Sequence, residues 1–163
     1  MKLIAAVDNE WNIGKGGDLL FHIPTDMKFF RSTTSGKTVV MGRKTLDSFP
    51  GGKALPKRVN IVLTANPDFE RENVNVCNSV DEVLSECEKY DTDDVYIIGG
   101  EAIYKLFLPY CDTALITHVN AVADGADKKF PDLSALPEWK LTQQSDIIEE
   151  NGYEYRFCTY KKD

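Results

Sequence analysis

The feature that most constrains this 163-residue chain is the alternation of short apolar runs with helical patterns. Runs typical of strands lie at residues 2–7, 38–41, 59–63, 74–77, 95–98 and 114–119, and helical patterns separate most of them. Two further extended stretches, 139–147 and 153–160, flank Asn151-Gly152, a dipeptide typical of a tight hairpin. We therefore predict a single α/β domain over residues 1–163, with flanking helices. Its twisted sheet is expected to have about eight mostly parallel strands and a C-terminal antiparallel hairpin, so that it is mixed.

Residues 8–22 contain Asn9, Asn12 and three glycines, and they are predicted to form one long loop. A helix is predicted to open at Pro24, because proline is favoured at the first helical position. Sheets of this kind bind ligands beyond the carboxyl ends of their strands. The candidate site loops therefore follow the strands that end near residues 7, 41, 63 and 98.

The charge of the chain is unevenly spread. The net charge is −7, so nonspecific binding to nucleic acid or to an anionic membrane is not expected. Residues 1–60, however, hold ten basic and five acidic side chains, which gives +5 and leaves −12 for the remainder. This pattern indicates either a local site for anions or a chance fluctuation on a solvated surface.

The four cysteines, Cys77, Cys87, Cys111 and Cys158, form no C-x-x-C pair, and with only two histidines no metal site is expected. We predict that they are small, mostly buried thiols. No apolar run approaches the ~20 residues of a membrane helix, and the first apolar run is too short for a signal peptide. The expectation is a cytoplasmic monomer.

Two predicted strand-to-helix junctions carry glycine. Gly42 precedes Arg43, Lys44 and Thr45, so backbone N–H groups and two cations meet where a phosphate would bind well. Gly99-Gly100 would let the backbone approach a ligand closely. The alternatives are a loop with solvated charges and a simple tight turn. Two such junctions on one sheet favour a dinucleotide over a mononucleotide.

Three polar side chains are further candidates. Asp26 lies in the first turn of the helix opened by Pro24, near Phe30, where it could bind an amidine-like group or assist a proton transfer. The alternative is an acid that complements the helix dipole. Arg58 could clamp a carboxylate or be a solvated charge. Thr117, in an apolar strand, needs a hydrogen-bond partner, which could be backbone or a carboxylate.

These segments follow one another in an order that resembles dihydrofolate reductase of the bacterial type over nearly the whole chain. The motifs are Leu3-Ile4-Ala5-Ala6-Val7, Ile13-Gly14, Ile23-Pro24-Thr25-Asp26-Met27-Lys28-Phe29-Phe30, Val40-Met41-Gly42-Arg43-Lys44-Thr45, Leu55-Pro56-Lys57-Arg58-Val59-Asn60, Ile98-Gly99-Gly100-Glu101-Ala102-Ile103-Tyr104, Thr117-His118 and Phe130-Pro131-Asp132. Each motif alone is weak, but the ordered series is highly specific.

The resemblance implies NADPH-dependent reduction of 7,8-dihydrofolate to 5,6,7,8-tetrahydrofolate, in support of one-carbon and thymidylate metabolism. Hydride would go to C6, and N5 would be protonated. Asp26 matches the acid that binds the pterin and promotes this protonation, and Thr117 matches the residue linked to it. Phe21 and Leu19, from the loop beside the pterin, complete the implied catalytic set. Leu20-Phe21 replaces a Pro-Trp pair of many members, so Phe21 can cover the pterin but lacks an indole N–H.

The resemblance also implies binding sets, with antifolate inhibitors among the ligands. The folate pocket matches Ile4, Ala5, Asp26, Met27, Phe30, Phe49, Leu55, Ile98, Tyr104 and Thr117, and Arg58 matches the clamp on the α-carboxylate of the glutamate tail. The NADPH contacts match Ala6, Ile13, Gly14, Lys15, Gly17, Asp18, Gly42, Arg43, Lys44, Thr45, Leu63, Thr64, Ala65, Gly99, Gly100, Glu101, Ala102, Ile103 and Tyr104.

Two positions depart from the pattern on the cofactor side. Asn78 and Ala102 stand where some members place a basic residue on the cofactor phosphate. The preference for NADPH over NADH then rests on Arg43, Lys44 and Thr64. Two other functions stay open: a pyrimidine reductase of riboflavin synthesis with the same fold, and a non-catalytic protein that binds a dinucleotide.

Overall fold

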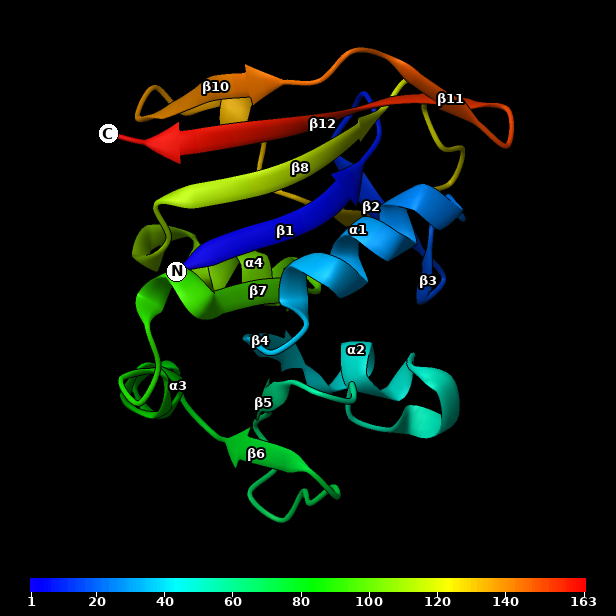
Figure 1. The fold of residues 1–163 in the computed structure, drawn as a ribbon. Helices are drawn as coiled ribbons and strands as arrows, with labels where there is room; N and C mark the ends of the chain where they lie inside the picture. Colours follow the sequence, from blue (N-terminus) through cyan, green and yellow to red (C-terminus); the bar gives the residue numbers. More distant parts are fainter.

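The computed structural model describes residues 1–163 and is built on one large mixed sheet (Figure 1). Its strands follow the order β10-β12-β8-β1-β7-β4-β5-β6, and the short β11 pairs with β12 beside this path. The strands are β1 (Lys2–Val7), β4 (Thr38–Gly42), β5 (Val59–Leu63), β6 (Val74–Cys77), β7 (Val95–Gly99), β8 (Thr113–Val119), β10 (Trp139–Gln144), β11 (Ile148–Glu150) and β12 (Tyr153–Lys162). β1 and β4 to β8 pair in parallel, whereas β12 is antiparallel to each of its neighbours. The predicted mixed sheet is confirmed.

The predicted C-terminal hairpin is also present. Asn151 and Gly152 connect β11 to β12 with φ angles of 53° and 78°. Two consecutive positive φ angles match the twist of the flanking strands, and asparagine followed by glycine adopts them at little cost. The turn thereby sets the register in which β12 continues along β8.

Helices cover both faces of the sheet, with α1 (Pro24–Thr34) and α2 (Arg43–Asp47) on one face and α3 (Val80–Cys87) and α4 (Glu101–Phe107) on the other (Figure 1). Successive strand residues divide between the faces: Leu3 packs with the α3–α4 face, and Ile4 packs with the α1–α2 face. Short 3-10 turns occur at Pro50–Gly52, Thr92–Asp94, Leu108–Tyr110 and Leu133–Ala135. Pro24 occupies the first position of α1, as predicted.

The prediction of a loop over residues 8–22 was wrong. This segment contains β2 (Asn12–Lys15) and β3 (Asp18–Leu19), which form a second sheet with β9 (Lys128–Lys129) in the order β3-β2-β9. Gly16 and Gly17, with φ angles of 59° and 86°, make the tight turn between β2 and β3. The Gly-Gly pair was the available sequence indication of this hairpin.

The buried Asp8 connects the end of β1 to this second sheet. Its carboxylate accepts hydrogen bonds from the backbone N–H groups of Glu10, Asn12 and Ala123 and from the side chain of Asn12, at 2.8–2.9 Å. Burial alone would raise the pKa of Asp8, but these hydrogen bonds lower it below its usual value. Asp8 therefore fixes the start of the segment that carries many of the predicted cofactor contacts.

All four cysteines are buried as free thiols, as predicted. Burial raises the pKa of Cys87 to about 11 and that of Cys111 to about 12. No helix in the structure combines the length and apolar character required to span a membrane.

Candidate functional site

An apolar wall on the α1–α2 face brings most of the predicted folate-pocket residues together. Ile4 is part of its buried core, and Phe30, Phe49, Leu55 and Ile98 pack against that core from α1, the segment after α2 and β7. Five residues that are widely separated in the sequence therefore line one side of the sheet. Such a surface would accept a flat aromatic ring.

Three other predicted pocket residues lie differently. Met27 is 44% exposed and lies outside this wall. Ala5 packs against the larger core, and Tyr104 is buried in it, where its hydroxyl donates a 2.7 Å hydrogen bond to the carbonyl of Ile4. Tyr104 therefore contacts the wall through the β1 backbone.

Asp26 and Thr117 lie together at one end of the wall. Thr117 is 2% exposed in β8, between β1 and β12, and its Oγ1 donates a 2.6 Å hydrogen bond to Oδ1 of Asp26 in the first turn of α1. Burial raises the pKa of Asp26, and the hydrogen bond from Thr117 partly opposes this. One carboxylate oxygen is thus held, while the other has no protein donor, an arrangement suited to an N–H group of a ligand.

The guanidinium of Arg58 is held by three oxygen acceptors. Nε donates to Oγ1 of Thr34 at 2.7 Å, Nη1 donates to the carbonyl of Pro56 at 2.8 Å, and Nη2 donates to the carbonyl of Arg31 at 3.2 Å. Partial burial and the charge of Arg31 lower the pKa of Arg58. No acidic side chain forms an ion pair with it. A fixed arginine without a carboxylate partner fits a carboxylate of a ligand.

The predicted loop residues lie on and beside the small second sheet. Gly14 in β2 pairs with Leu19 in β3, and Leu19 is 68% exposed. The ring of Phe21 packs edge-on against Tyr153 at a centroid distance of 5.2 Å, in a cluster around Ile23. Phe21 therefore packs with the β11–β12 hairpin and not with the wall that contains Phe30.

The two glycine junctions lie on neighbouring strands, because β4 and β7 pair with Met41 opposite Gly99. Helices α2 and α4 start directly after Gly42 and Gly100, and neither start has a side-chain cap. A Cβ atom at Gly99 would lie 3.1 Å from the ring of Tyr104, so the junction packs tightly on α4. The Gly99–Gly100 peptide bond is cis.

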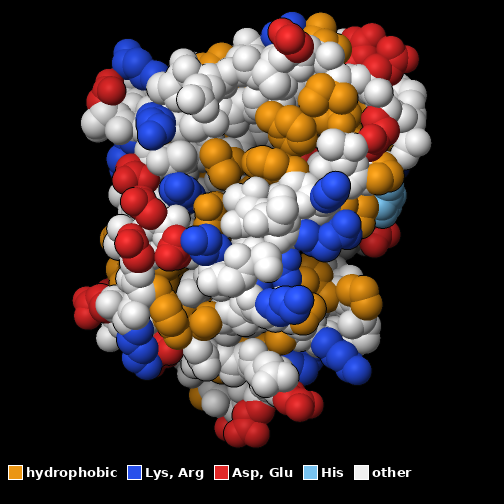
Figure 2. Space-filling model, viewed as in Figure 1, with side chains coloured by type: hydrophobic (Ala, Val, Ile, Leu, Met, Phe, Trp, Pro, Cys, Tyr) orange, Lys and Arg blue, Asp and Glu red, His pale blue; other side chains and the backbone are white.

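These junctions fit the phosphates of a dinucleotide. A Cβ atom at Gly100 would lie 3.9 Å from Oγ1 of Thr45, so the first turns of α2 and α4 are close to each other. Uncapped N–H groups, the Thr45 hydroxyl and the exposed cations of Arg43 and Lys44 form a donor set with the chemistry of a phosphate site. Figure 2 shows Lys and Arg side chains over the middle of the face that carries α1 and α2.

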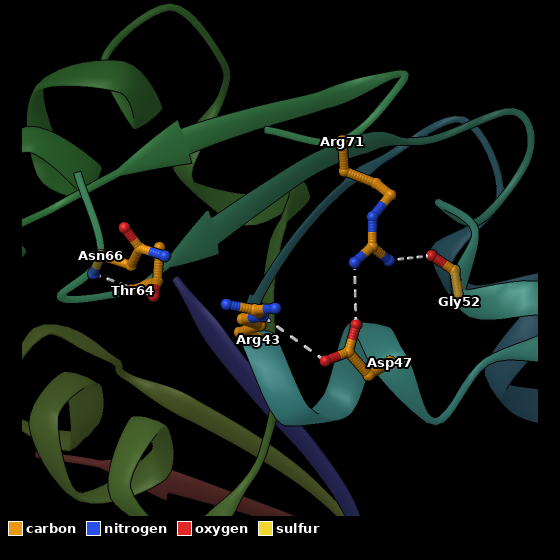
Figure 3. Close-up of polar contacts among 6 residues, drawn as sticks. All are labelled: Arg43, Asp47, Gly52, Thr64, Asn66 and Arg71. Carbon is orange, nitrogen blue, oxygen red and sulfur yellow. Dashed lines mark hydrogen bonds and ion pairs between the residues drawn. The ribbon is translucent and has the colours of Figure 1, made fainter. Parts of the chain in front are cut away.

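Leu63 ends β5, and the loop after it carries two further predicted cofactor residues, Thr64 and Ala65; Glu101, Ala102 and Ile103 lie in the first turn of α4. The hydroxyl of Thr64 accepts a 3.3 Å hydrogen bond from the N–H of Asn66 (Figure 3). The side chain of Asn78 donates to the carbonyls of Thr64 and Asn66 at 2.8 and 3.2 Å. Asn78 therefore supports the backbone of this loop.

Sequence reasoning missed three residues beside Arg43. Asp47, Phe69 and Arg71 contact one another or Arg43, although they lie on α2 and on the loop between β5 and β6. Asp47 is four residues after Arg43, which is a spacing that indicates an ion pair on a helix. Neither the spacing nor the composition indicates the contacts with Phe69 and Arg71.

Comparisons with known proteins agree with this geometry. A family model described as dihydrofolate reductase matches residues 1–162. The dihydrofolate reductase of Bacillus subtilis (strain 168) is 37% identical over 164 residues, covering 99% of this chain and 94% of that protein. The dihydrofolate reductase type 3 of Salmonella typhimurium is 35% identical over 163 residues, with 99% and 98% covered.

A solved structure is similar to the whole fold. The dihydrofolate reductase from Enterococcus faecalis, complexed with NADP(H) and RAB-propyl, superposes with a TM-score of 0.86 at 36% sequence identity. The match covers 99% of this chain and 95% of that chain. By family model, sequence identity and fold, the chain belongs to the dihydrofolate reductase family.

Proposed function

We propose that this chain catalyses the NADPH-dependent reduction of 7,8-dihydrofolate to tetrahydrofolate, with Asp26 at the centre of the substrate site. The observation that carries the proposal is the hydrogen bond between Thr117 and Asp26 at the end of an apolar wall. Bound NADPH would supply the hydride, because no amino-acid side chain can. The residues of the chain bind and orient the substrate and govern the proton.

Asp26 would receive the 2-amino group and a ring N–H of the pterin. Thr117 donates to Oδ1, so the remaining lone pairs of the carboxylate are left for the N–H groups of the pterin. A pKa raised by burial suits a group that keeps a proton near N5 at the moment when C6 is reduced. A water between Asp26 and N5 would complete the transfer.

Arg58 would bind the α-carboxylate of the glutamate tail. Its side chain is already oriented by Thr34 and by two backbone carbonyls, so little rotamer entropy is lost on binding. The pterin at Asp26 and the carboxylate at Arg58 would place the linking benzoyl ring along Phe49 and Leu55, which pack on the same wall. A folate needs both an acid for its pterin and an arginine for its glutamate tail. A site that offers both groups therefore favours a folate over a pyrimidine substrate without a tail.

The two glycine junctions would bind the phosphates of NADPH, and Arg43, Lys44 and Thr64 would lie by its adenosine phosphate. The segment around Ile13 and Gly14 would border the nicotinamide, supported by Asp8 and the second sheet. We further infer that the enzyme is a cytoplasmic monomer of one domain that antifolates inhibit. Its four free, buried cysteines support a reducing compartment.

The direct test follows the near-ultraviolet absorbance of reduced nicotinamide, with and without dihydrofolate. We expect NADPH to be oxidised only when dihydrofolate is present. Addition of methotrexate should stop this oxidation. Cofactor binding without oxidation would refute the proposal in favour of a non-catalytic dinucleotide-binding protein. Oxidation with a riboflavin-pathway pyrimidine, but not with dihydrofolate, would refute it in favour of the other reductase.

A further inference from the structure

One carboxylate joins two arginines beside the proposed phosphate site (Figure 3). Oδ2 of Asp47 lies 3.5 Å from Nε of Arg43, and Oδ1 of Asp47 lies 3.0 Å from Nη2 of Arg71. Arg43 begins α2 and Asp47 ends it, whereas Arg71 comes from the loop between β5 and β6. The three side chains together carry a charge of +1, which is what a site for an anion requires.

The ring of Phe69 holds both arginines in place. The guanidinium carbon of Arg43 lies 4.5 Å from the ring centroid, and that of Arg71 lies 5.1 Å from it. Phe69 is only 6% exposed, so the ring itself is fixed by the apolar wall. The negative face of an aromatic ring attracts both cations and allows two like charges to lie near one another.

The two arginines differ in how much of their hydrogen-bonding capacity the protein uses. Arg71 donates to the carbonyl of Gly52 and to Asp47, and a Cβ atom at Gly52 would lie 3.0 Å from Nη1 of Arg71. Arg43 is 45% exposed along its side chain and has one ion pair at 3.5 Å, without a hydrogen bond to any protein acceptor. Arg43 is therefore the arginine that is free to bind a ligand.

Asp47 would oppose this binding if Arg71 were not present. A carboxylate 3.5 Å from Arg43 competes with a phosphate for the same guanidinium and also repels the phosphate. Arg71 lies closer to Asp47 than Arg43 does and takes up its charge. This matters in this chain because Asn78 and Ala102 provide no cation of their own.

We propose that Arg71 is a specificity-determining positioning residue, which neutralises Asp47 and so leaves Arg43 free for the 2′-phosphate that distinguishes NADPH from NADH. The inference rests on the proposed cofactor. It assigns Arg71 an effect through Asp47 and Arg43, without a contact between Arg71 and the cofactor. A loop anchor with no electrostatic role would instead affect both cofactors equally, because they differ only in that phosphate.

The test is a set of three variants, R71Q, D47N and R71Q/D47N, with Kd measured for NADPH and NADH at low ionic strength. R71Q leaves Arg43 as the only ion-pair partner of Asp47, so it should weaken NADPH binding roughly 5-fold, the size expected for a half-exposed charge pair, with NADH unchanged. The double variant removes the competing carboxylate and should restore NADPH binding toward that of the wild type. Added salt should shrink the effect of R71Q, because it screens the charges.

Two comparisons keep the outcome decisive. D47N leaves Arg71 in place, with its cation–π contact to Phe69 and its hydrogen bond to Gly52. It therefore tests the role of Asp47 even if R71Q is unstable. The D47N variant should bind NADPH at least as tightly as the wild type. K89Q, which removes an equal charge at the remote ion pair with Glu86, should change neither Kd.

Weaker NADPH binding in D47N, no rescue in the double variant, or equal losses for both cofactors in R71Q would overturn the role of Arg71. A wild-type chain that binds NADPH and NADH equally would instead overturn the proposed cofactor preference, and this inference with it.

Discussion

Thr117 donates a 2.6 Å hydrogen bond from the middle of the sheet to the carboxylate of Asp26, 91 positions earlier in the chain. The bond joins the first turn of α1 to β8 and makes the position of the acid depend on both elements. Because one carboxylate oxygen is occupied in this way, the orientation of the other is set before any ligand arrives. The proposed chemistry depends on that orientation.

Asp26→Asn should abolish most turnover at neutral pH while NADPH binding is retained. The amide keeps the shape of the side chain and can accept from Thr117, but it cannot hold the proton, so a loss of about 100-fold or more in kcat is expected. Stopped-flow or steady-state oxidation of NADPH measures kcat, and fluorescence titration measures NADPH binding. Near-normal turnover would remove Asp26 from the mechanism.

The same variant should be more stable than the wild type at neutral pH. Burial raises the folded-state pKa of Asp26 above its unfolded value, so the folded chain binds the proton more tightly. The stabilisation of the folded state by this tighter proton binding is complete below the unfolded pKa of about 3.9. It is lost as pH rises through the folded pKa. At neutral pH the charged acid is therefore a cost, and Asp26→Asn should raise Tm in thermal unfolding. A lower Tm than wild type at that pH contradicts this.

Thr117→Val should shift the pH dependence of turnover upward. The hydrogen bond from Thr117 lowers the pKa of Asp26, so its removal leaves burial unopposed and raises that pKa further. The alkaline limb of the kcat profile is expected to move to higher pH, and kcat itself should fall because the carboxylate is no longer oriented. Thr117→Ser keeps the hydroxyl and serves as the control. Identical pH profiles for the Val and Ser variants would show that the bond has no part in the titration.

Arg58→Ala should raise the KM for dihydrofolate by about 10- to 100-fold, the range expected when a hydrogen-bonded charge pair is lost. The KM for NADPH should remain close to that of the wild type. A dihydropterin without a glutamate tail should be reduced equally by both proteins, because it has no carboxylate for the arginine. Lys53→Ala, at an exposed lysine five positions earlier in the chain, is the matched control. A larger change for NADPH than for dihydrofolate would argue against the clamp.

Asp8→Asn should destabilise the fold, most strongly near neutral pH. Asparagine would point its amide donors at N–H groups that now donate to the carboxylate, which costs about 1–3 kcal/mol. The pKa of Asp8 is lowered on folding, so its stabilisation is present above the unfolded pKa and is lost as pH falls through the folded pKa. Urea unfolding of wild type and variant should therefore converge in acid. Asp146→Asn, at an exposed acid, should show no such difference.

The sequence predicted those parts of the fold that local patterns determine. Asn151-Gly152 indicated the hairpin, and Pro24 indicated the start of α1, because both residues restrict their own backbone. The strands β2 and β3 were missed because they have only four and two residues, and because β2 gains its second partner, β9, from more than 100 positions away. Such pairing depends on the tertiary fold and leaves no periodic pattern.

The candidate site shows the same division. The ordered motifs predicted an acid, an arginine clamp and two glycine junctions, and the structure brings Ile4, Phe30 and Ile98 to one wall. The contacts of Phe69 and Arg71 were missed, because an arginine in a loop without a periodic pattern has no recognisable context in the sequence. Likewise, the packing of Phe21 on Tyr153 depends on where the hairpin folds back.

The burial of all four cysteines has a practical consequence for this enzyme. Thiolates are the reactive form, and burial holds the pKa of Cys87 and Cys111 at about 11 and about 12, so these native thiols would react slowly with maleimide dyes at neutral pH. A cysteine introduced at the exposed Leu19 would then be the preferred site of labelling in the otherwise native protein. A single fluorophore placed there would report how the surroundings of the β2–β3 hairpin change when cofactor and substrate bind.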